Sequence, residues 1–269
     1  MQYISLTLTG LSDDKIDECI ALLDDELHLG MQQEEHTLSI FYLEEHKEQA
    51  LANIKKLNLE VYIQEIPLEN WNQSWEKNFE PIRIQNKIAL RADFHEPIPE
   101  VDYELIITPK MSFGTGHHAT TQQMLSMMLD IDFENKSVFD FGCGTGVLAI
   151  FAEKKGASYI EGIDNEAWSV ENAKDNALRN ACQKVVFSSK DISEVENEFD
   201  IILANINLNI LTFYLKQIYN LLAPQGILLL SGILESDIKS FEIKLLEENL
   251  QIHKKTVEKE WACLYINKI

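Results

Sequence analysis

Three glycines alternate with other residues at positions 142, 144 and 146, within the segment VFDFGCGTG. They follow a buried apolar run, SVFDF, and precede GVLAIFAEKKG, whose apolar spacing is typical of a helix. A glycine-rich turn between a strand and a helix lets a ligand approach the backbone closely. Gly142 and Gly144 are therefore candidate cofactor contacts, and the alternative is a tight turn that binds nothing.

The spacing of these glycines separates two classes of cofactor. A dinucleotide site needs the pattern G-x-G-x-x-G, and Val147 stands here in place of its third glycine. The nucleotide pattern G-x-x-x-x-G-K followed by Ser or Thr is absent from the sequence. The loop thus favours a cofactor that presents no pyrophosphate, and a nicotinamide oxidoreductase is disfavoured.

Polar side chains stand where the next predicted strands end. Asp164 closes SYIEGID, Asp191 follows VVFSS, and Asn205 closes FDIILAN. Because parallel strands end at one crevice, Asp164 can accept both hydroxyls of a ribose, and Asn205 offers a donor and an acceptor there. Asp191 is placed to read an adenine amino group. The alternative for each of the three is to cap the element that follows it.

The segment PKMSFGTGHHATTQQM, residues 109–124, precedes the glycine loop in the chain. Its glycines make a flexible loop, after which Thr120 or Thr121 can start a helix. His117 and His118 are adjacent, so their side chains diverge, and no acidic or cysteine partner lies at a ligand spacing. We therefore expect no metal here, but a loop that covers the cofactor and shapes the acceptor site.

The elements that must position these residues alternate regularly from residue 137 onward. Strand and helix patterns follow one another with short connections, which predicts a doubly wound α/β domain with a seven-stranded Rossmann-like sheet and helices on both faces. Residues 1–66 are typical of a βαββαβ unit with an edge strand near 30–34, a small ferredoxin-like α+β domain.

The region between these two domains, residues 67–110, is predicted to hold a linker helix and a hairpin. Trp71, Trp75 and Phe79 recur at helical spacing, which favours a helix packed into the domain junction over a substrate platform. Residues 82–91 are typical of a hairpin. The expected divisions of the chain are 1–66, 67–110 and 111–269.

The composition limits the function further. The chain has 269 residues, a net charge of −21 and four cysteines in no CxxC pair, which fits a protein of a reducing cytoplasm. No apolar run is long enough for a membrane helix, and we find no signal peptide. The acidity disfavours nucleic acid and favours a basic partner, although acidity that only keeps the protein soluble is equally consistent.

From about residue 68 onward the sequence resembles the ribosomal protein L11 methyltransferases of the PrmA type, which have the class I S-adenosylmethionine-dependent fold. The stretches that carry the resemblance are NWNQSWEKNFEPIRI, FGTGHHATT, VFDFGCGTGVLAI, GIDNEA, LANI, LSGIL and EKEWACL. The first 66 residues match only in layout. The chain departs from the family at Lys110, where a glycine is usual, and at Ile-Asn-Leu-Asn after Asn205, which bears on the acceptor pocket.

The resemblance implies S-adenosylmethionine as cofactor, with contacts at Thr121, Gly142, Asp164 and Asn205. It implies N-methylation of lysine side chains, the N-terminal α-amine or both on a basic large-subunit ribosomal protein, recognised by the small domain. We expect a monomer that binds no nucleic acid directly. No general base is visible, an aromatic acceptor channel is expected, and Asn205 is the candidate that orients the amine. The alternatives are a methyltransferase for RNA or a small molecule, and a non-catalytic S-adenosylmethionine-binding regulator.

Overall fold

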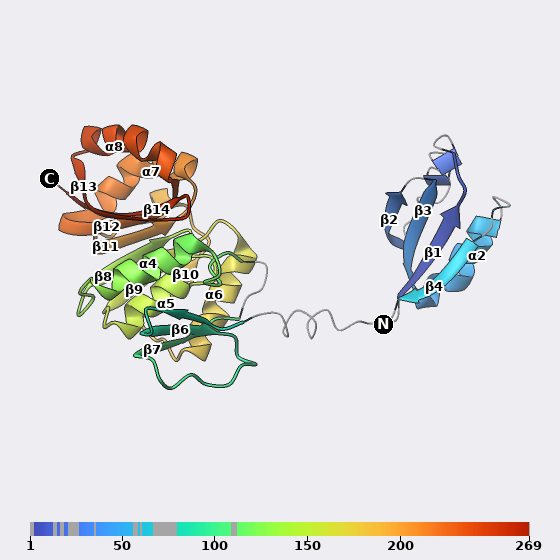
Figure 1. The fold of residues 1–269 in the computed structure, drawn as a ribbon, viewed down its shortest axis with the longest axis horizontal. Helices are drawn as coiled ribbons and strands as arrows, with labels where there is room; N and C mark the ends of the chain where they lie inside the picture. Colours follow the sequence, from blue (N-terminus) through green and yellow to red (C-terminus); the bar gives the residue numbers. More distant parts are fainter. Residues whose placement is uncertain are drawn as a thin grey trace. The chain divides into compact units, whose positions relative to one another are not determined.

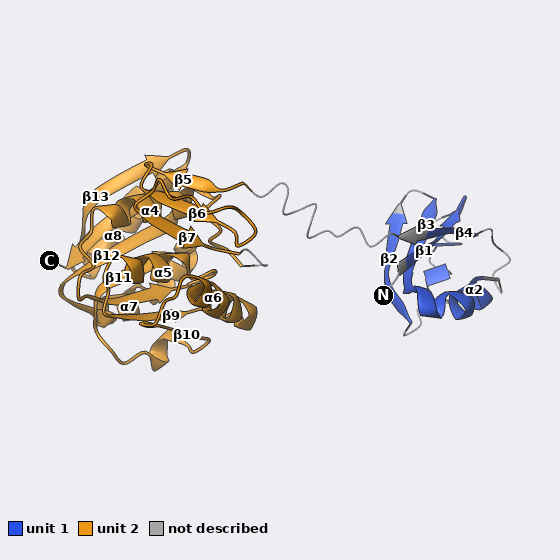
Figure 2. Cartoon of the chain, turned by 90° about the horizontal axis from the view of Figure 1, so that it is seen from below, with its two compact units in different colours: residues 1–79 blue, residues 80–269 orange. Residues whose placement is uncertain are grey.

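The computed structural model describes residues 3–12, 15–16, 19–20, 27–34, 36–55, 59, 61–66, 80–108 and 112–268. The chain divides into two compact units, residues 1–79 and 80–269 (Figure 2). The predicted helix with Trp71, Trp75 and Phe79 lies outside the described residues, and so does Lys110.

The first unit is built on a four-stranded antiparallel sheet with the order β2-β3-β1-β4. Its elements are β1 (Tyr3–Thr9), β2 (His28–Glu34), β3 (Thr37–Leu43), a 3₁₀ turn η1 (Glu44–His46), α2 (Lys47–Lys55) and β4 (Val61–Ile66). Residues 15–16 and 19–20, between β1 and β2, are also helical. This order and pairing confirm the predicted ferredoxin-like unit.

Alternation along β3 explains how this unit acquires a core. Leu38, Ile40 and Tyr42 are fully buried, whereas the residues between them are only partly buried. Successive side chains of a strand point to opposite faces, so these three lie on one face. They belong to one cluster with Ala50 and Ile54 of α2.

The second unit contains a seven-stranded sheet with the order β10-β9-β8-β11-β12-β14-β13. Its strands are β8 (Ser137–Phe141), β9 (Tyr159–Ile163), β10 (Val185–Ser188), β11 (Phe199–Asn205), β12 (Leu222–Leu234), β13 (Leu250–Glu258) and β14 (Trp261–Lys268). The first five strands pair in parallel, and β14 runs antiparallel to both β12 and β13. The predicted doubly wound Rossmann-like sheet is confirmed.

Helices cover both faces of this sheet (Figure 1). They are α4 (Ala119–Leu129), α5 (Val147–Lys154) and α6 (Ala167–Arg179) over one core, and α7 (Leu208–Leu221) and α8 (Ile238–Glu247) over the other. Strand β11 serves both cores, because Ile201 and Leu203 face the first and Ile202 and Ala204 the second. Two short 3₁₀ turns complete the unit, η2 (Ile192–Glu194) and η3 (Glu235–Asp237).

A separate three-stranded sheet precedes the first of these helices. It consists of β5 (Ile82–Ile84), β6 (Ile88–Arg91) and β7 (Tyr103–Ile106). The β5–β6 hairpin turns at Gln85 and Asn86, whose φ angles are 50° and 54°, so the predicted hairpin is confirmed. Strand β7, parallel to β6, was not predicted from the sequence.

The end of β7 and the residues after it are hydrogen-bonded to two asparagines, Asn176 of α6 and Asn180, the C-cap residue of that helix. Asn180 accepts a hydrogen bond from the Ile106 N–H and donates one to its carbonyl, and Asn176 accepts from the Thr108 N–H. This segment precedes the FGTG loop in the sequence. Among the described residues, no helix is both long and apolar enough to cross a membrane.

Candidate functional site

The glycine loop after β8 is bound to the end of the neighbouring strand β9. The N–H groups of Gly142 and Cys143 both donate to the Ile163 carbonyl, each at 2.9 Å. Gly142 and Gly144 have φ angles of 75° and 54°, in the left-handed region that favours glycine. The loop is therefore held open at the carboxyl edge of the sheet, where parallel folds bind ligands.

The FGTG loop packs directly on this turn. The Thr145 N–H donates to the Phe113 carbonyl at 2.8 Å, and the Thr145 hydroxyl donates to the Gly114 carbonyl at 2.7 Å. A Cβ atom on Gly144 would lie 2.3 Å from the Phe113 carbonyl oxygen. Position 144 must lack a side chain for the two loops to meet.

Asp164 is the carboxylate between the glycine loop and helix α6. Its Oδ2 accepts from the Gly144 N–H at 2.9 Å and its Oδ1 from the Glu166 N–H at 3.0 Å. Each carboxylate oxygen can accept a second bond. Asp164 therefore holds the N–H of Glu166, the N-cap residue of α6, without being that cap itself, and it keeps capacity for two further hydroxyl donors.

Asn205 closes β11 on the opposite side of the loop. Its Nδ2 donates to the Thr121 hydroxyl at 3.3 Å, while its Oδ1 is buried and has no hydrogen-bond partner. The chain then turns at Ile206, whose carbonyl oxygen would lie 2.3 Å from a Cβ atom on Gly232. A buried unpaired oxygen costs free energy, so Asn205 is prepared for a donor that a ligand supplies.

Two adjoining hollows open around these residues. The first, of about 470 Å³, is lined by Phe113, His118, Thr120, Gly142, Gly144, Asp164, Asn165, Glu166, Trp168, Ser169, Asn205, Ile206, Asn207, Ile210, Gly232 and Trp261. The second, of about 400 Å³, is lined by Phe141, Gly142, Ile163, Asp164, Asn165, Ser189, Lys190, Asp191, Ile192, Ile206, Ile210 and Tyr214. Gly142 and Asp164 border both hollows, which makes them one cleft with Asp164 at its middle.

An aromatic wall bounds the first hollow. The His118 ring lies between Phe113 and Trp261, with ring centroids 5.5 Å and 5.2 Å away. Trp168 stands at the same hollow with 51% of its surface exposed, and Phe113 with 53%. Large exposed aromatic side chains beside a cleft that also holds a few polar groups are typical of a binding site.

His118 has a structural task as well. Its side chain is the N-cap of α4, and Nδ1 accepts from the Thr120 N–H at 3.3 Å. The neutral ring therefore carries its proton on Nε2. The helix begins at Ala119, one residue before the threonines considered as its start.

The structure places the remaining candidates as follows. Thr121 is 1% exposed and does not line the cleft, which Thr120 does, so Thr121 stands behind Asn205 and supports it. Asp191 lines the second hollow and also caps η2, where its Oδ1 accepts from the Ser193 N–H at 2.9 Å. Within the described ranges no group of His, Cys, Asp and Glu could hold a metal ion.

Asp140 lies beneath the glycine loop and is 1% exposed. Burial, with the nearby Asp164 carboxylate as a smaller cause, raises its pKa to about 7 although its Oδ2 accepts from the Ala149 N–H. The unfolded chain ionises near ~3.9, so between these two values only the folded state holds the proton. Rising pH then favours the unfolded state, and this destabilisation is complete only above the folded pKa.

We expect Asp140→Asn to remove that pH dependence. The free energy of unfolding of the variant, relative to the unchanged protein, should rise by about 2–3 kcal/mol from pH 5 to pH 8. Urea unfolding at both pH values measures it. A difference that does not change with pH would show that Asp140 does not titrate in this range.

Sequence reasoning did not assign roles to Phe113, His118, Trp168, Gly232 and Trp261 as lining residues. Four of them lie in the stretches FGTGHHATT, LSGIL and EKEWACL, which carried the family resemblance. The sequence thus marked these positions but gave no role to the individual residues. Trp168 follows GIDNEA directly. Local spacing could not show that these residues meet, because they come from four separate parts of the chain.

The sheet order, the glycine loop and the cleft at the carboxyl edge of the sheet are those of a class I S-adenosylmethionine-dependent methyltransferase. The family model "Ribosomal protein L11 methyltransferase (PrmA)" matches residues 10–269. The chain belongs to the ribosomal protein L11 methyltransferase family.

Individual relatives agree with this assignment. A ribosomal protein L11 methyltransferase of Phocaeicola vulgatus is 35% identical over 98% of this chain and 98% of its own length. One of Porphyromonas gingivalis is 46% identical over 63% of this chain and 59% of its own length. A crystal structure of a ribosomal protein L11 methylase from Lactobacillus delbrueckii subsp. bulgaricus superposes with a TM-score of 0.66 at 27% identity, covering 71% of this chain and 99% of that one.

The methyl donor of this enzyme family is S-adenosylmethionine, and the cleft fits it. Asp164 has acceptor capacity for a ribose, and the orphaned Oδ1 of Asn205 requires a donor. Gly142 and Gly144 line the cleft without side chains. A molecule that carries ribose hydroxyls and an N–H donor meets the first two of these features.

Proposed function

We propose that the chain binds S-adenosylmethionine across the two hollows with Asp164 on the ribose. Gly142 and Gly144 border the cofactor from below, and Asn205, supported by Thr121, offers its free oxygen to a cofactor or substrate N–H. Asp191 and the apolar side chains of the second hollow are suited to an adenine ring. The support for this assignment is that both hollows meet at Asp164.

When bound, the cofactor supplies a methyl group: the acceptor nitrogen bonds to the methyl carbon as the carbon–sulfur bond breaks, leaving S-adenosylhomocysteine. The chain contributes chiefly by holding the two reactants in line, and positioning of this kind can supply about 7–11 kcal/mol. Phe113, His118 and Trp261 exclude water from one side of the first hollow. Asn205 lies across that hollow and can orient the amine through its Oδ1.

The acceptor that we propose is an amine of a basic large-subunit ribosomal protein, either a lysine side chain, the N-terminal α-amine or both. The relatives named above are ribosomal protein L11 methyltransferases, and a net charge of −21 favours encounter with a basic protein over RNA. The observation that carries the proposal is the aromatic wall in the cleft that also contains Asp164 and the glycine loop.

Aromatic walls suit this reaction because the attacking amine must be neutral. Deprotonating a lysine of pKa ~10.4 at pH 7 costs about 4.6 kcal/mol, and an α-amine of pKa ~8 costs about 1.4 kcal/mol. An apolar surrounding disfavours the ammonium form and lowers this cost. Among the described residues, the carboxylates that line the first hollow are Asp164 and Glu166, and Asp164 already accepts two backbone N–H groups.

We further propose that the first unit recognises the substrate protein and that the enzyme acts as a monomer without direct contact to nucleic acid. The first unit has its own sheet and core, and the described cofactor-cleft residues all belong to the second unit. Recognition and methyl transfer are thus divided between separately packed parts of the chain.

The function is tested with a chain that begins at residue 80. The full-length enzyme with methyl-labelled S-adenosylmethionine and a ribosomal extract should label a large-subunit protein. The shortened chain should bind S-adenosylmethionine with unchanged affinity and label that protein only at background level, because its recognition unit is missing. Calorimetry and mass spectrometry of the labelled products give the two measurements.

Two results would contradict these proposals separately. Label in purified ribosomal RNA instead of protein would show that the substrate class is wrong. Methylation of the intact ribosomal protein by the shortened chain at the full-length rate would leave the substrate class in place and remove the recognition role of the first unit.

A further inference from the structure

Gln123 is a buried amide that joins helix α4 to the β13–β14 hairpin. Its side-chain Nε2 donates to the Trp261 carbonyl at 3.0 Å and approaches the Glu258 carbonyl at 3.5 Å. These two residues flank the turn between the strands, because Glu258 ends β13 and Trp261 begins β14. A single side chain, 5% exposed, therefore holds both sides of the turn against the helix.

The same turn carries the indole of the aromatic wall. Trp261 lines the cofactor cleft, and its ring meets the ring of His118, the N-cap of α4. The helix and the hairpin are therefore joined by two contacts. The His118 ring at the start of α4 meets the Trp261 ring, and Gln123 of the same helix donates to the Trp261 carbonyl.

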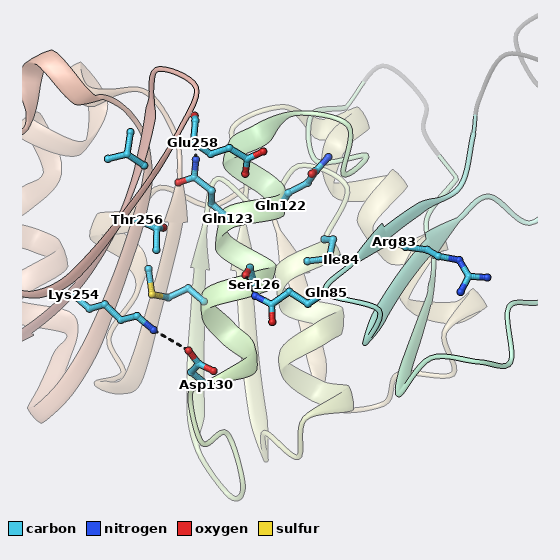
Figure 3. A pocket seen from close by; sticks show the side chains of 12 residues that line it. Arg83, Ile84, Gln85, Gln122, Gln123, Ser126, Asp130, Lys254, Thr256 and Glu258 are labelled. Carbon is cyan, nitrogen blue, oxygen red and sulfur yellow. Dashed lines mark hydrogen bonds and ion pairs between the residues drawn. The ribbon is translucent and has the colours of Figure 1, made fainter.

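Figure 3 shows Gln123 leaving α4 toward the strand that carries Glu258, while Ser126 lies near Gln85 on the other side. These residues line a groove of about 440 Å³ between α4, the β5–β6 turn and β13, and Gln123 is one of its lining residues. Its Oε1 is buried and has no hydrogen-bond partner. A leucine or methionine at this position would leave the Trp261 carbonyl without its donor, so the amide nitrogen is the part of the side chain that joins the turn to the helix.

We propose that Gln123 is a positioning residue of the methyl transfer reaction. Its N–H groups hold the β13–β14 turn so that the Trp261 ring stands against His118 at the acceptor side of the cleft. Gln123 itself touches neither cofactor nor acceptor. The inference rests on the proposed amine-acceptor role of the aromatic wall, which it extends to the helix behind that wall.

The test compares Gln123→Glu with Ser126→Ala. Glutamate has the shape of glutamine but cannot donate to the two carbonyls when ionised. Ser126 lies one turn further along α4 beside the same groove and touches Gln85 and not the hairpin. Gln123→Glu should lower kcat/KM for the ribosomal protein by about tenfold, the effect of losing one hydrogen bond to a well-defined partner, and Ser126→Ala should not.

Two further readouts separate positioning from a general structural role. The dissociation constant of S-adenosylmethionine should stay the same in Gln123→Glu, because the cofactor contacts lie on other elements. In a Trp261→Ala background the additional loss caused by Gln123→Glu should disappear, since Gln123 acts through that ring. Additive losses, or weaker cofactor binding in step with activity, would overturn the proposal.

A fluorescence measurement tests the contact between Gln123 and Trp261 without any methyl acceptor. It therefore remains informative even if the proposed function is wrong. With Trp71, Trp75 and Trp168 replaced by phenylalanine, the fluorescence of the chain comes from Trp261 alone. Acrylamide should quench this emission more strongly in Gln123→Glu than in the parent chain with the three phenylalanine replacements. Ser126→Ala should be quenched to the same degree as that parent chain. Equal quenching in all three proteins would show that Gln123 does not hold Trp261, whatever the substrate is.

Discussion

Asp164→Ala is expected to weaken S-adenosylmethionine binding by at least about two orders of magnitude. The carboxylate has room for two hydroxyl donors, and a hydrogen bond to a charged group contributes roughly 1.5–3 kcal/mol. Loss of two such bonds corresponds to about a 10²- to 10⁴-fold rise in the dissociation constant. The Gly144 N–H, which donates to Asp164 at 2.9 Å, also loses its acceptor, so the loop beneath the cofactor is loosened.

Calorimetric titration of the cofactor into the folded variant measures this loss, and circular dichroism verifies the fold. Asp164→Asn is the matched control, because it keeps the shape and one acceptor oxygen but removes the charge. Its affinity should fall between those of the unchanged protein and the alanine variant. Unchanged affinity in Asp164→Ala would remove Asp164 from the ribose.

Gly144→Ala is expected to abolish cofactor binding by separating two loops. The added Cβ would lie 2.3 Å from the Phe113 carbonyl oxygen, and this oxygen belongs to backbone that cannot rotate away. The FGTG loop must then move, and the hydrogen bond from the Thr145 N–H to Phe113 is lost. The left-handed backbone at position 144, with a φ of 54°, adds about 1–2 kcal/mol of strain for alanine.

Gly10→Ala separates the two contributions to this effect. Gly10 also has a left-handed backbone, with a φ of 72°, but nothing lies within 4 Å of a Cβ atom placed there. It should show the strain alone, as a small fall in melting temperature with normal cofactor affinity. If Gly144→Ala bound S-adenosylmethionine normally, contact between the two loops would not be needed for the site.

The sequence predicted well the elements whose signals are local. Alternating strand and helix patterns predicted the sheet and its covering helices, and the pattern of residues 82–91 predicted the hairpin that β5 and β6 form. Strand β7 was missed because it is four residues long, follows a proline-rich stretch and is completed by asparagines of α6 far along the chain. A strand that depends on distant partners leaves little pattern of its own.

For the candidate site, too, the sequence predicted some lining residues and missed others. Gly142, Gly144, Asp164 and Asn205, the cofactor contacts expected from the sequence, all line the cleft, because each lies at or just after the end of a strand and parallel strands bring their ends to one edge. Thr121 was named with them, yet it is Thr120 that lines the cleft, because the helix starts at Ala119 and its rotation decides which threonine faces inward.

The sequence by itself determined the doubly wound sheet and the edge at which its strand-end polar residues gather, and it disfavoured a dinucleotide cofactor, since glycine spacing and strand periodicity are local properties of the chain. Tertiary structure alone decided what faces that edge. The meeting of Trp261 with His118, and the bond from Gln123 that holds Trp261 there, join a helix near the middle of the chain to a hairpin near its end. Such contacts arise from packing between distant segments, which no spacing within either segment encodes.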